Sequence, residues 1–209
     1  MEKVNRALDK NENTSYDAAY KAVRTNIEFL HTEHDLKVIL VVAPEEQSGK
    51  CKFVQNLAIV LASKERKVLL MDCDLHQGIL TKYMGMDDDA GVSELLSISS
   101  TKEKREQIVQ NVYFMPCGKI VGDPSELFLS YKAGDCLKDL CQEYDYIILD
   151  APAMQEANDA IDLSRVADGV VMLIQADTTK MKSAENCKKR LQAVNAKIIG
   201  AVLNGGESL

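Results

Sequence analysis

Residues 38–58 read VILVVAPEEQSGKCKFVQNLA, and they contain a β-branched apolar run, a polar turn and the start of a helical pattern. A short run rich in Val and Ile predicts a strand that is buried on both faces. The helical pattern extends from Lys50 to Ser63. Gly49 and Lys50 lie at the junction, where backbone N–H groups and a lysine can surround phosphates. The stretch therefore predicts the strand, loop and helix of a phosphate-binding loop (P-loop, Walker A).

The same alternation of strand and helix recurs along the chain. Between the predicted strands lie helical patterns at residues 16–30, 50–63, 125–143, 159–166 and 179–194, and residues 84–111 read as a connection with one short helix at 92–96. Such alternation predicts an α/β fold of three layers, with a mostly parallel central sheet and helices on both faces. The predicted strands are residues 38–42, 67–71, 112–115, 146–149, 170–174 and 198–203.

Length and charge limit the possible classes of protein. With 209 residues, of which 46% are hydrophobic, the chain can fill one core, so we expect one domain at 15–209 after a flexible N-terminus at 1–14. The net charge of −7 disfavours nucleic acid as a partner. The chain has no signal peptide and no apolar run long enough to span a bilayer, which predicts a cytoplasmic protein.

Three aspartates lie at the ends of predicted strands. Asp72 and Asp74 follow the second strand and Asp150 follows the fourth. Side chains two apart in a strand point the same way, so Asp72 and Asp74 are expected to face one Mg²⁺, with Asp150 beside the loop. The alternative interpretation is that these aspartates only end strands or cap helices.

The chain resembles the bacterial protein-tyrosine kinases of capsular and exopolysaccharide synthesis, which are related to the MinD/ParA-like P-loop ATPases. The likeness runs from about residue 16 to 204 and rests on several ordered motifs. They are AYKAVRTNIEFL (19–30), QSGKCKFVQNLA (47–58), VLLMDCDLHQG (68–78), GVSELL (91–96), DPSEL (123–127), YDYIILDAPAMQEANDA (144–160), ADGVVMLIQADTT (167–179) and IIGAVLN (198–204).

The resemblance implies a role for each matching position. Lys50 would contact the β- and γ-phosphates of ATP, and Asp72 would be the base for a tyrosine hydroxyl, so these two are the candidate catalytic residues. Asp74 and Asp150 would help to hold Mg²⁺. The candidate nucleotide-binding residues are Gln47, Ser48, Gly49, Lys50, Cys51, Lys52 and Asn204, the last at the place where related ATPases contact adenine.

Departures from the family pattern gather on the phosphate loop. Cys51 replaces the hydroxyl that should ligate Mg²⁺, and a thiol is a poor ligand for a hard cation. Lys52 replaces a threonine, and Gln47 replaces a glycine. Glu45 and Glu46 bring negative charge toward an anionic ligand. These departures predict weakened Mg-ATP binding.

The resemblance also implies partners. They are protein tyrosine substrates and the cytoplasmic segment of a membrane-anchored regulator of polysaccharide chain length, which would hold the chain at the inner face of the plasma membrane. The self-association motif of the family is reduced to Ala18, Lys21 and Arg24, so a homo-oligomer stays an open alternative.

Three functions remain at this stage. The first is an ATP-dependent, autophosphorylating tyrosine kinase. The second is a degenerate relative that acts as a nucleotide-sensing interaction module, which Gln47, Cys51 and Lys52 favour. The third is a MinD/ParA-like positioning ATPase, which Glu45 disfavours because that class carries a signature lysine there.

Overall fold

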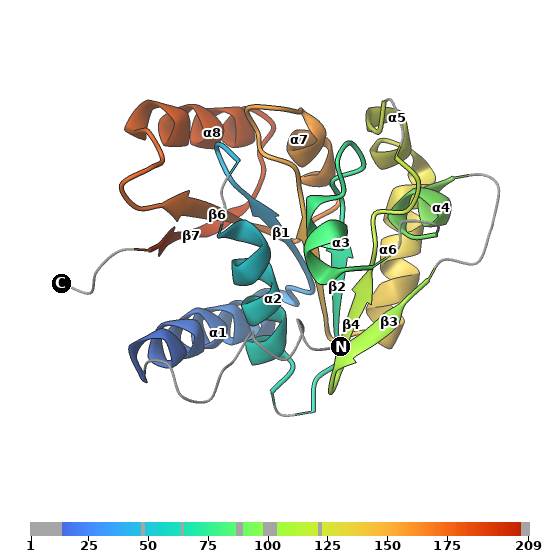
Figure 1. Ribbon diagram of the computed structural model, residues 1–209, viewed down its shortest axis with the longest axis horizontal. Coiled ribbons are helices and arrows are strands. Elements are labelled where there is room, and N and C mark those ends of the chain that lie inside the picture. The colour runs from blue at the N-terminus through green and yellow to red at the C-terminus, as the bar shows by residue number, and fades with distance from the viewer. Residues whose placement is uncertain are drawn as a thin grey trace.

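A seven-stranded sheet forms the centre of the computed structural model, which describes residues 14–46, 49–63, 65–86, 90–97, 104–120 and 123–205. The sheet has the order β3-β4-β2-β5-β1-β6-β7, and every pairing is parallel except that of β3 with β4 (Figure 1). The predicted α/β class with a mostly parallel sheet is confirmed. The strands are β1 (Val38–Val42), β2 (Val68–Asp72), β3 (Glu106–Val109), β4 (Val112–Met115), β5 (Tyr146–Asp150), β6 (Gly169–Gln175) and β7 (Ile198–Asn204).

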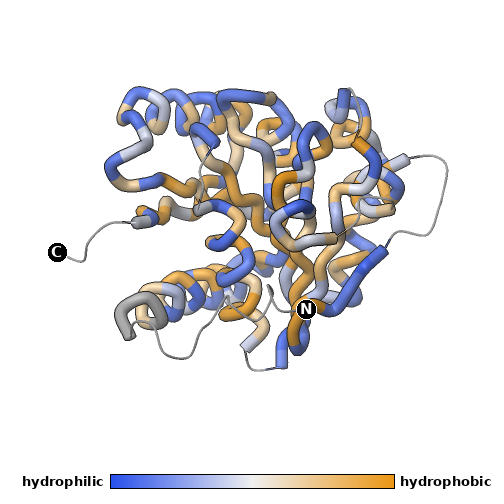
Figure 2. The backbone as a smooth tube through the Cα atoms, viewed as in Figure 1, coloured by the Kyte–Doolittle hydropathy of each residue, from blue (hydrophilic) through white to orange (hydrophobic). Residues whose placement is uncertain are grey.

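Helices cover both faces of this sheet and make two separate apolar clusters. The tube is orange along the central strands and bluer on the outer helices (Figure 2). One face packs against α1 (Thr14–His34), α2 (Lys50–Leu61) and α3 (Ile79–Met84). The other face packs against α4 (Val92–Leu96), α5 (Ser125–Phe128), α6 (Tyr131–Glu143), α7 (Asp159–Leu163) and α8 (Met181–Ala193).

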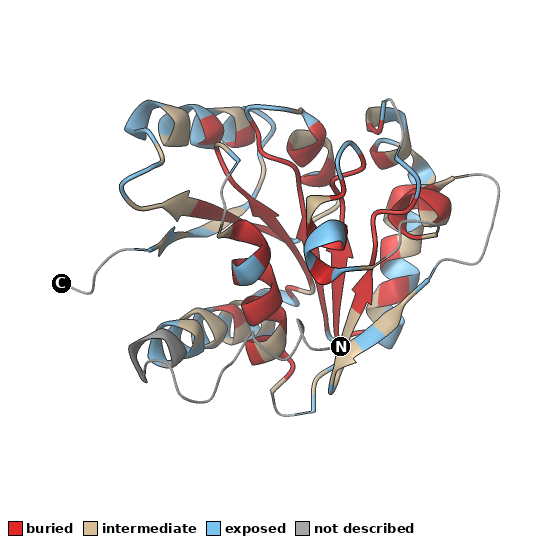
Figure 3. Cartoon of the chain, viewed as in Figure 1, coloured by how far each residue is buried: buried red, intermediate tan, exposed pale blue. Residues whose placement is uncertain are grey.

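The register of the central strands decides where the functional side chains meet. All five residues of β1, β2 and β5 are buried (Figure 3), as expected for strands covered on both faces. Asp72 pairs with Asp150 across β2 and β5, and Val41 of β1 pairs with Asp150 from the other side. Because these strands are parallel, their carboxyl ends open on the same edge of the sheet, and the loop after β1 lies there too.

Two predicted boundaries are corrected by the structure. The connecting region at 84–111 contains β3, a partly exposed edge strand that pairs antiparallel with β4 across a turn at Asn111, which has a φ of 62°. The four residues of β3 show too little alternation of polar and apolar side chains to predict a strand. The single helix predicted at 125–143 is two helices, because Ser130 is extended and its side chain caps α6 by accepting from the N–H of Ala133.

Gly91 offers a test of how closely α4 is packed. A Cβ at this position would lie 1.9 Å from the carbonyl oxygen of Pro116. We therefore expect Gly91→Ala to lower the free energy of unfolding by roughly 1–3 kcal/mol in urea titrations. The matched control is Gly134→Ala in α6, where nothing lies within 4 Å of the added Cβ. That change should raise stability by about 0.5–1 kcal/mol, so equal effects of the two substitutions would contradict the packing argument.

Candidate active site

The loop after β1 leads directly into α2. Gly49 precedes the helix with φ −93° and ψ −8°, and its carbonyl accepts from the N–H of Phe53 at 2.9 Å. Gln47 and Ser48 lie outside the described residues. Lys52 is exposed on the first turn of α2, whereas Lys50 and Cys51 are buried.

Lys50 points into the protein, toward the end of β5. Its Nζ lies 2.8 Å from Oδ1 of Asp150 and also donates to the carbonyl oxygen of Ala151, and the residue is 6% exposed. Burial alone would lower the pKa of Lys50, but the negative charges of Asp150 and Asp72 outweigh it, so the pKa is raised. The ammonium therefore stays charged, and one of its three N–H donors is left for a phosphate oxygen.

Asp72 is buried beside this pair, and both of its oxygens accept hydrogen bonds. Its Oδ2 accepts from the N–H and the hydroxyl of Thr81, both at 2.7 Å, and its Oδ1 accepts from the N–H of Asp74 at 3.0 Å. Burial and the charge of Asp150 raise the pKa of Asp72 to about 7, and the hydrogen bonds from Thr81 and Asp74 oppose that rise. A carboxylate with a pKa near neutral pH is suited to accept a proton.

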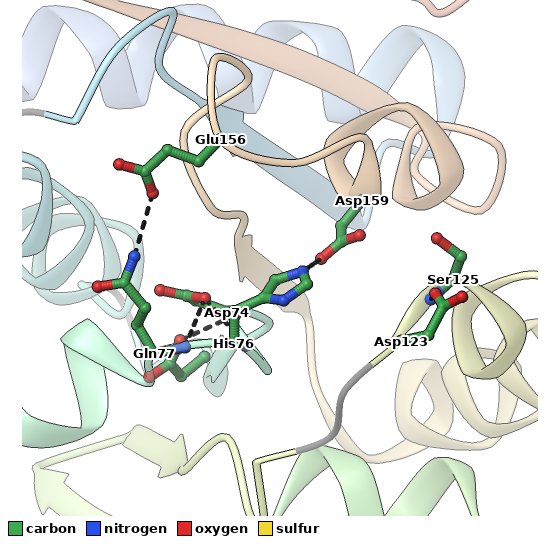
Figure 4. Close-up of polar contacts among 8 residues, drawn as sticks. Asp74, His76, Gln77, Asp123, Ser125, Glu156 and Asp159 are labelled. Carbon is green, nitrogen blue, oxygen red and sulfur yellow. Dashed lines mark hydrogen bonds and ion pairs between the residues drawn. The ribbon is translucent and has the colours of Figure 1, made fainter.

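Asp74 does not continue the strand as the sequence spacing suggested. β2 ends at Asp72, and Asp74 lies in the turn that follows. Its Oδ1 accepts from the N–H groups of His76 and Gln77, at 3.2 and 3.1 Å (Figure 4). The expectation that Asp72 and Asp74 face one ion through strand alternation is therefore corrected, because alternation stops where the backbone turns. Asp74 still lies at the same edge of the sheet, and its Oδ2 takes no part in the hydrogen bonds to His76 and Gln77.

The described residues supply some but not all of the ligands that Mg²⁺ needs. Within the described residues, no group of three or more His, Cys, Asp or Glu side chains could by itself hold a metal ion. Apart from the contact of Oδ1 with Lys50, neither buried oxygen of Asp150 accepts a hydrogen bond, so this carboxylate keeps lone pairs for another ligand. Carboxylates of this kind suit Mg²⁺ when phosphate and water supply the remaining ligands.

Cys51 does not fit a magnesium site. Burial and the charge of Asp150 raise the pKa of the Cys51 thiol to about 12. The thiol therefore stays neutral at physiological pH, and a neutral sulfur is a poor ligand for a hard cation. The sequence indicated that Cys51 is a poor ligand for Mg²⁺, and its burial near Asp150 gives the physical reason.

Asn204 lies next to the loop, at the end of β7. Its Nδ2 donates to Oε1 of Gln175 at 2.9 Å, and a Cβ built on Gly49 would lie 2.4 Å from that Nδ2. The structure thus brings Asn204 beside Gly49, although more than 150 residues separate them in the chain. Gln175, at the end of β6, was not predicted, because an isolated glutamine after a strand gives no signal in a sequence.

A second set of contacts joins the turn after β2 to the segment after β5. His76 Nε2 lies 2.7 Å from Oδ2 of Asp159 at the start of α7, and Gln77 donates to Glu156 at 3.2 Å (Figure 4). Burial raises the pKa of Asp159, and its contact with His76 opposes that rise. These pairs were missed, because the partners are about 80 residues apart and only the sheet brings them together.

Glu45 of the loop contacts a different element. Its Oε1 accepts a hydrogen bond from the hydroxyl of Ser183 in α8 at 2.5 Å. The negative charge at this position is therefore engaged within the same chain, on the α8 side of the loop.

A strand, a phosphate loop and acidic strand ends at one edge of a parallel sheet define the P-loop nucleotide-binding class. The family described as AAA domain matches residues 36–201, and Tyrosine-protein kinase YwqD of Bacillus subtilis is 30% identical over 89% of this chain and 79% of its own length. The chain belongs to this family and, within it, to the bacterial tyrosine-protein kinases. The putative tyrosine-protein kinase CapB of Staphylococcus aureus is 27% identical over 88% of this chain and 82% of its own length.

Solved structures share the fold of this chain. The chimerical protein CapA2B2 has a TM-score of 0.88 at 22% identity, covering 100% of this chain and 92% of its own. The BceF tyrosine kinase domain has a TM-score of 0.79 at 29% identity, covering 89% of this chain and 76% of its own. The septum site-determining protein MinD of Pyrococcus horikoshii, complexed with Mg-ADP, has a TM-score of 0.66 at 23% identity, covering 82% of this chain and 72% of its own.

Some relatives are much longer than this chain. The tyrosine-protein kinase Wzc of Salmonella typhimurium is 25% identical over 89% of this chain, and the match covers 26% of Wzc. No helix in the described part of this chain is both long enough and apolar enough to cross a membrane.

Proposed function

We propose that this chain is an ATP-dependent, autophosphorylating protein-tyrosine kinase. The observation that carries the proposal is the meeting of Lys50, Asp150 and Asp72 at the carboxyl ends of adjacent strands, beside the loop that begins α2. Phosphoryl transfer needs chiefly positioning and charge neutralisation, and these groups supply both. Membership of the tyrosine-kinase family supports the choice of acceptor.

The contacts of the site support a separate role in phosphoryl transfer for each residue. Lys50, anchored by Asp150 and the Ala151 carbonyl, would direct its remaining N–H to the terminal phosphates. Asp72 would take the proton of the acceptor tyrosine as its oxygen bonds to phosphorus and the bond to the leaving ADP breaks. The hydrogen bonds from Thr81 and Asp74 would hold the Asp72 carboxylate in place during that step.

ATP and Mg²⁺ are the proposed cofactors, with Asp74 and Asp150 as the residues that would hold the ion. When bound, Mg²⁺ would neutralise charge on the phosphate oxygens. The Mg-ADP in the crystallised MinD supports nucleotide and magnesium binding by this fold in general. Gly49, Lys52 and Asn204, with Gln47 and Ser48, are the proposed nucleotide contacts.

We further propose that the kinase regulates capsular or exopolysaccharide synthesis together with a membrane-anchored chain-length regulator. The length of Wzc beyond the matched part leaves room for such a partner region in that protein. The proposed location is the cytoplasmic face of the plasma membrane, through that partner. Homologues named for capsule or exopolysaccharide genes, such as CapB, support this role.

A degenerate, nucleotide-sensing interaction module is the second candidate. The neutral, buried thiol of Cys51 favours it, because the position lacks the oxygen that Mg²⁺ prefers. A MinD/ParA-like positioning ATPase is disfavoured, because Glu45 carries the wrong charge for a signature lysine and bonds to Ser183 in its own chain.

Titration calorimetry with ATP and Mg²⁺ on the wild type, Cys51→Ser and Cys51→Ala separates these candidates. Serine supplies a hydroxyl oxygen, so we expect Cys51→Ser to bind Mg-ATP about tenfold more tightly, while Cys51→Ala stays close to the wild type. The same samples are then probed for phosphotyrosine. Binding and phosphorylation by the wild type support the kinase. Binding by the wild type without phosphorylation, tightened by serine, supports the module. No binding by any variant contradicts both.

A further inference from the structure

Tyr131 is the most accessible of the tyrosines whose side chains are described. Its side chain is 97% exposed, whereas Tyr83 is 46% exposed and Tyr146 is fully buried. The remaining described rings are packed against neighbours: Tyr20 stacks on Phe53, and Tyr113 meets Tyr144 edge to face. The side chain of Tyr16 lies outside the described residues. A hydroxyl that must enter the site of another molecule has to be free of such packing, and among the described tyrosines Tyr131 meets this condition best.

The backbone around Tyr131 is also accessible. Tyr131 is the first residue of α6, and Ser130 before it is extended, with φ −66° and ψ 147°. The first N–H groups of a helix have no acceptor within it, and helix ends fray most easily. Leu129 beside it is 51% exposed. The start of α6 can therefore place Tyr131 in the site of another molecule, and at most the first turn of α6 has to unfold.

Positive charge lies beside this tyrosine. Tyr131, Lys138 and Arg165 line one hollow of about 280 Å³. Lys138 pairs with Asp135 at 3.2 Å, but the exposed guanidinium of Arg165 has no carboxylate partner among the described residues. A phosphate on Tyr131 would add close to two negative charges next to this free cation, which favours the modified form.

The entrance to the nucleotide site has the opposite charge. Glu46 belongs to the loop and Glu156 to the segment after β5, which lies beside the loop because the N–H of Gln155 donates to the carbonyl of Pro44 at 3.1 Å; both glutamates are exposed. Partial burial and the negative charge of Glu46 raise the pKa of Glu156. Opposite charges on the two surfaces steer molecules together and fix their orientation. The basic surroundings of Tyr131 therefore suit the acidic entrance of a second copy.

We propose that Tyr131 is a phosphorylation site, modified by the nucleotide site of a second copy of this chain. The inference rests on the proposed kinase function. The second copy supplies the nucleotide site because Tyr131 is exposed to solvent while Lys50 is buried on Asp150. Among the described residues, no hydrogen bond or ion pair joins α6 to Lys50, Asp72 or Asp150. The Tyr131 oxygen bonds to the γ-phosphorus of ATP, the bond from that phosphorus to the β-phosphate oxygen breaks, ADP leaves, and the phenolic proton passes to Asp72 of the second copy.

The test mixes wild-type enzyme with an inactive acceptor that is distinguished by a size tag. The acceptor is Lys50→Met/Asp150→Asn, whose folding is checked by circular dichroism, and it carries either Tyr131→Phe or the matched control Tyr83→Phe. A synthetic Glu-Tyr copolymer measures kinase activity independently of this chain's tyrosines. We expect Tyr131→Phe to lower phosphotyrosine on the acceptor at least fivefold, Tyr83→Phe to change it less than twofold, and mass spectrometry to find phosphate on Tyr131.

Each other outcome has a defined meaning. Phosphorylation of the copolymer without phosphate on Tyr131 overturns this inference and leaves the kinase function standing. No phosphorylation of either substrate overturns the kinase function itself. Phosphate on Tyr131 of the wild type but not of the inactive acceptor overturns the role of a second copy. In a second measurement, Arg165→Glu should lower labelling of Tyr131 at least threefold with unchanged activity on the copolymer, and equal labelling contradicts the role of charge.

Discussion

Lys50→Met is expected to remove kinase activity and to lower the free energy of unfolding by roughly 3–5 kcal/mol, because it leaves Asp150 buried without its cation. Asp150 is 1% exposed, and apart from Lys50 no group donates a hydrogen bond to its oxygens that could compensate. The measurements are denaturant titration at pH 7 and phosphotyrosine formation. Lys52→Met, on the exposed side of the same helical turn, is the control for stability and should change it by less than about 0.5 kcal/mol.

The double variant Lys50→Met/Asp150→Asn separates the two effects of Lys50. Removing the charge of Asp150 should restore most of the lost stability, because the buried site no longer holds an unpaired ion. Activity should not return, because the cation for the phosphates is still missing. If Lys50→Met proves as stable as the wild type, the ion pair is not formed as described.

Asp72→Asn is expected to lower kcat by about 10²–10⁴-fold, because an amide cannot accept the tyrosine proton. In the wild type, kcat should rise with pH as Asp72 loses its proton, with a midpoint near its pKa of about 7. In Asp72→Asn, kcat should no longer fall as the pH drops below 7. The exposed Asp139→Asn on α6 is the control and should keep both the rate and the profile. A wild-type rate that does not change between pH 6 and 8 would exclude Asp72 as the base.

The same pKa makes a prediction about stability. Asp72 has a pKa of about 7 in the folded protein and 3.8 as its ordinary value, so the folded state binds more protons between those pH values. The contribution of Asp72 is therefore fully present below about pH 4 and is lost as the pH rises through 7, with an upper limit of about 4 kcal/mol. Asp72→Asn should flatten this part of the dependence of unfolding free energy on pH.

Sequence patterns identified the elements whose residues are strongly periodic. The strands at 38–42 and 112–115 were placed at their observed bounds, and the helix at 92–96 was found inside an otherwise irregular region. The edge strand β3 and the helix α3 were not predicted, because a short, partly exposed element is stabilised by its neighbours more than by its own pattern. The break at Ser130 was missed for a similar reason, since helical spacing continues across it.

For the site, the chain by itself determined which groups are available: one lysine after a glycine, three aspartates after strands, and a cysteine where an oxygen ligand is usual. Only the tertiary structure decided their states. Pairing of β5 with both β1 and β2 places Asp150 between Lys50 and Asp72, and burial then raises the pKa values of Asp72 and Cys51. Such shifts depend on distance and desolvation, which residues far apart in sequence acquire only when the sheet forms.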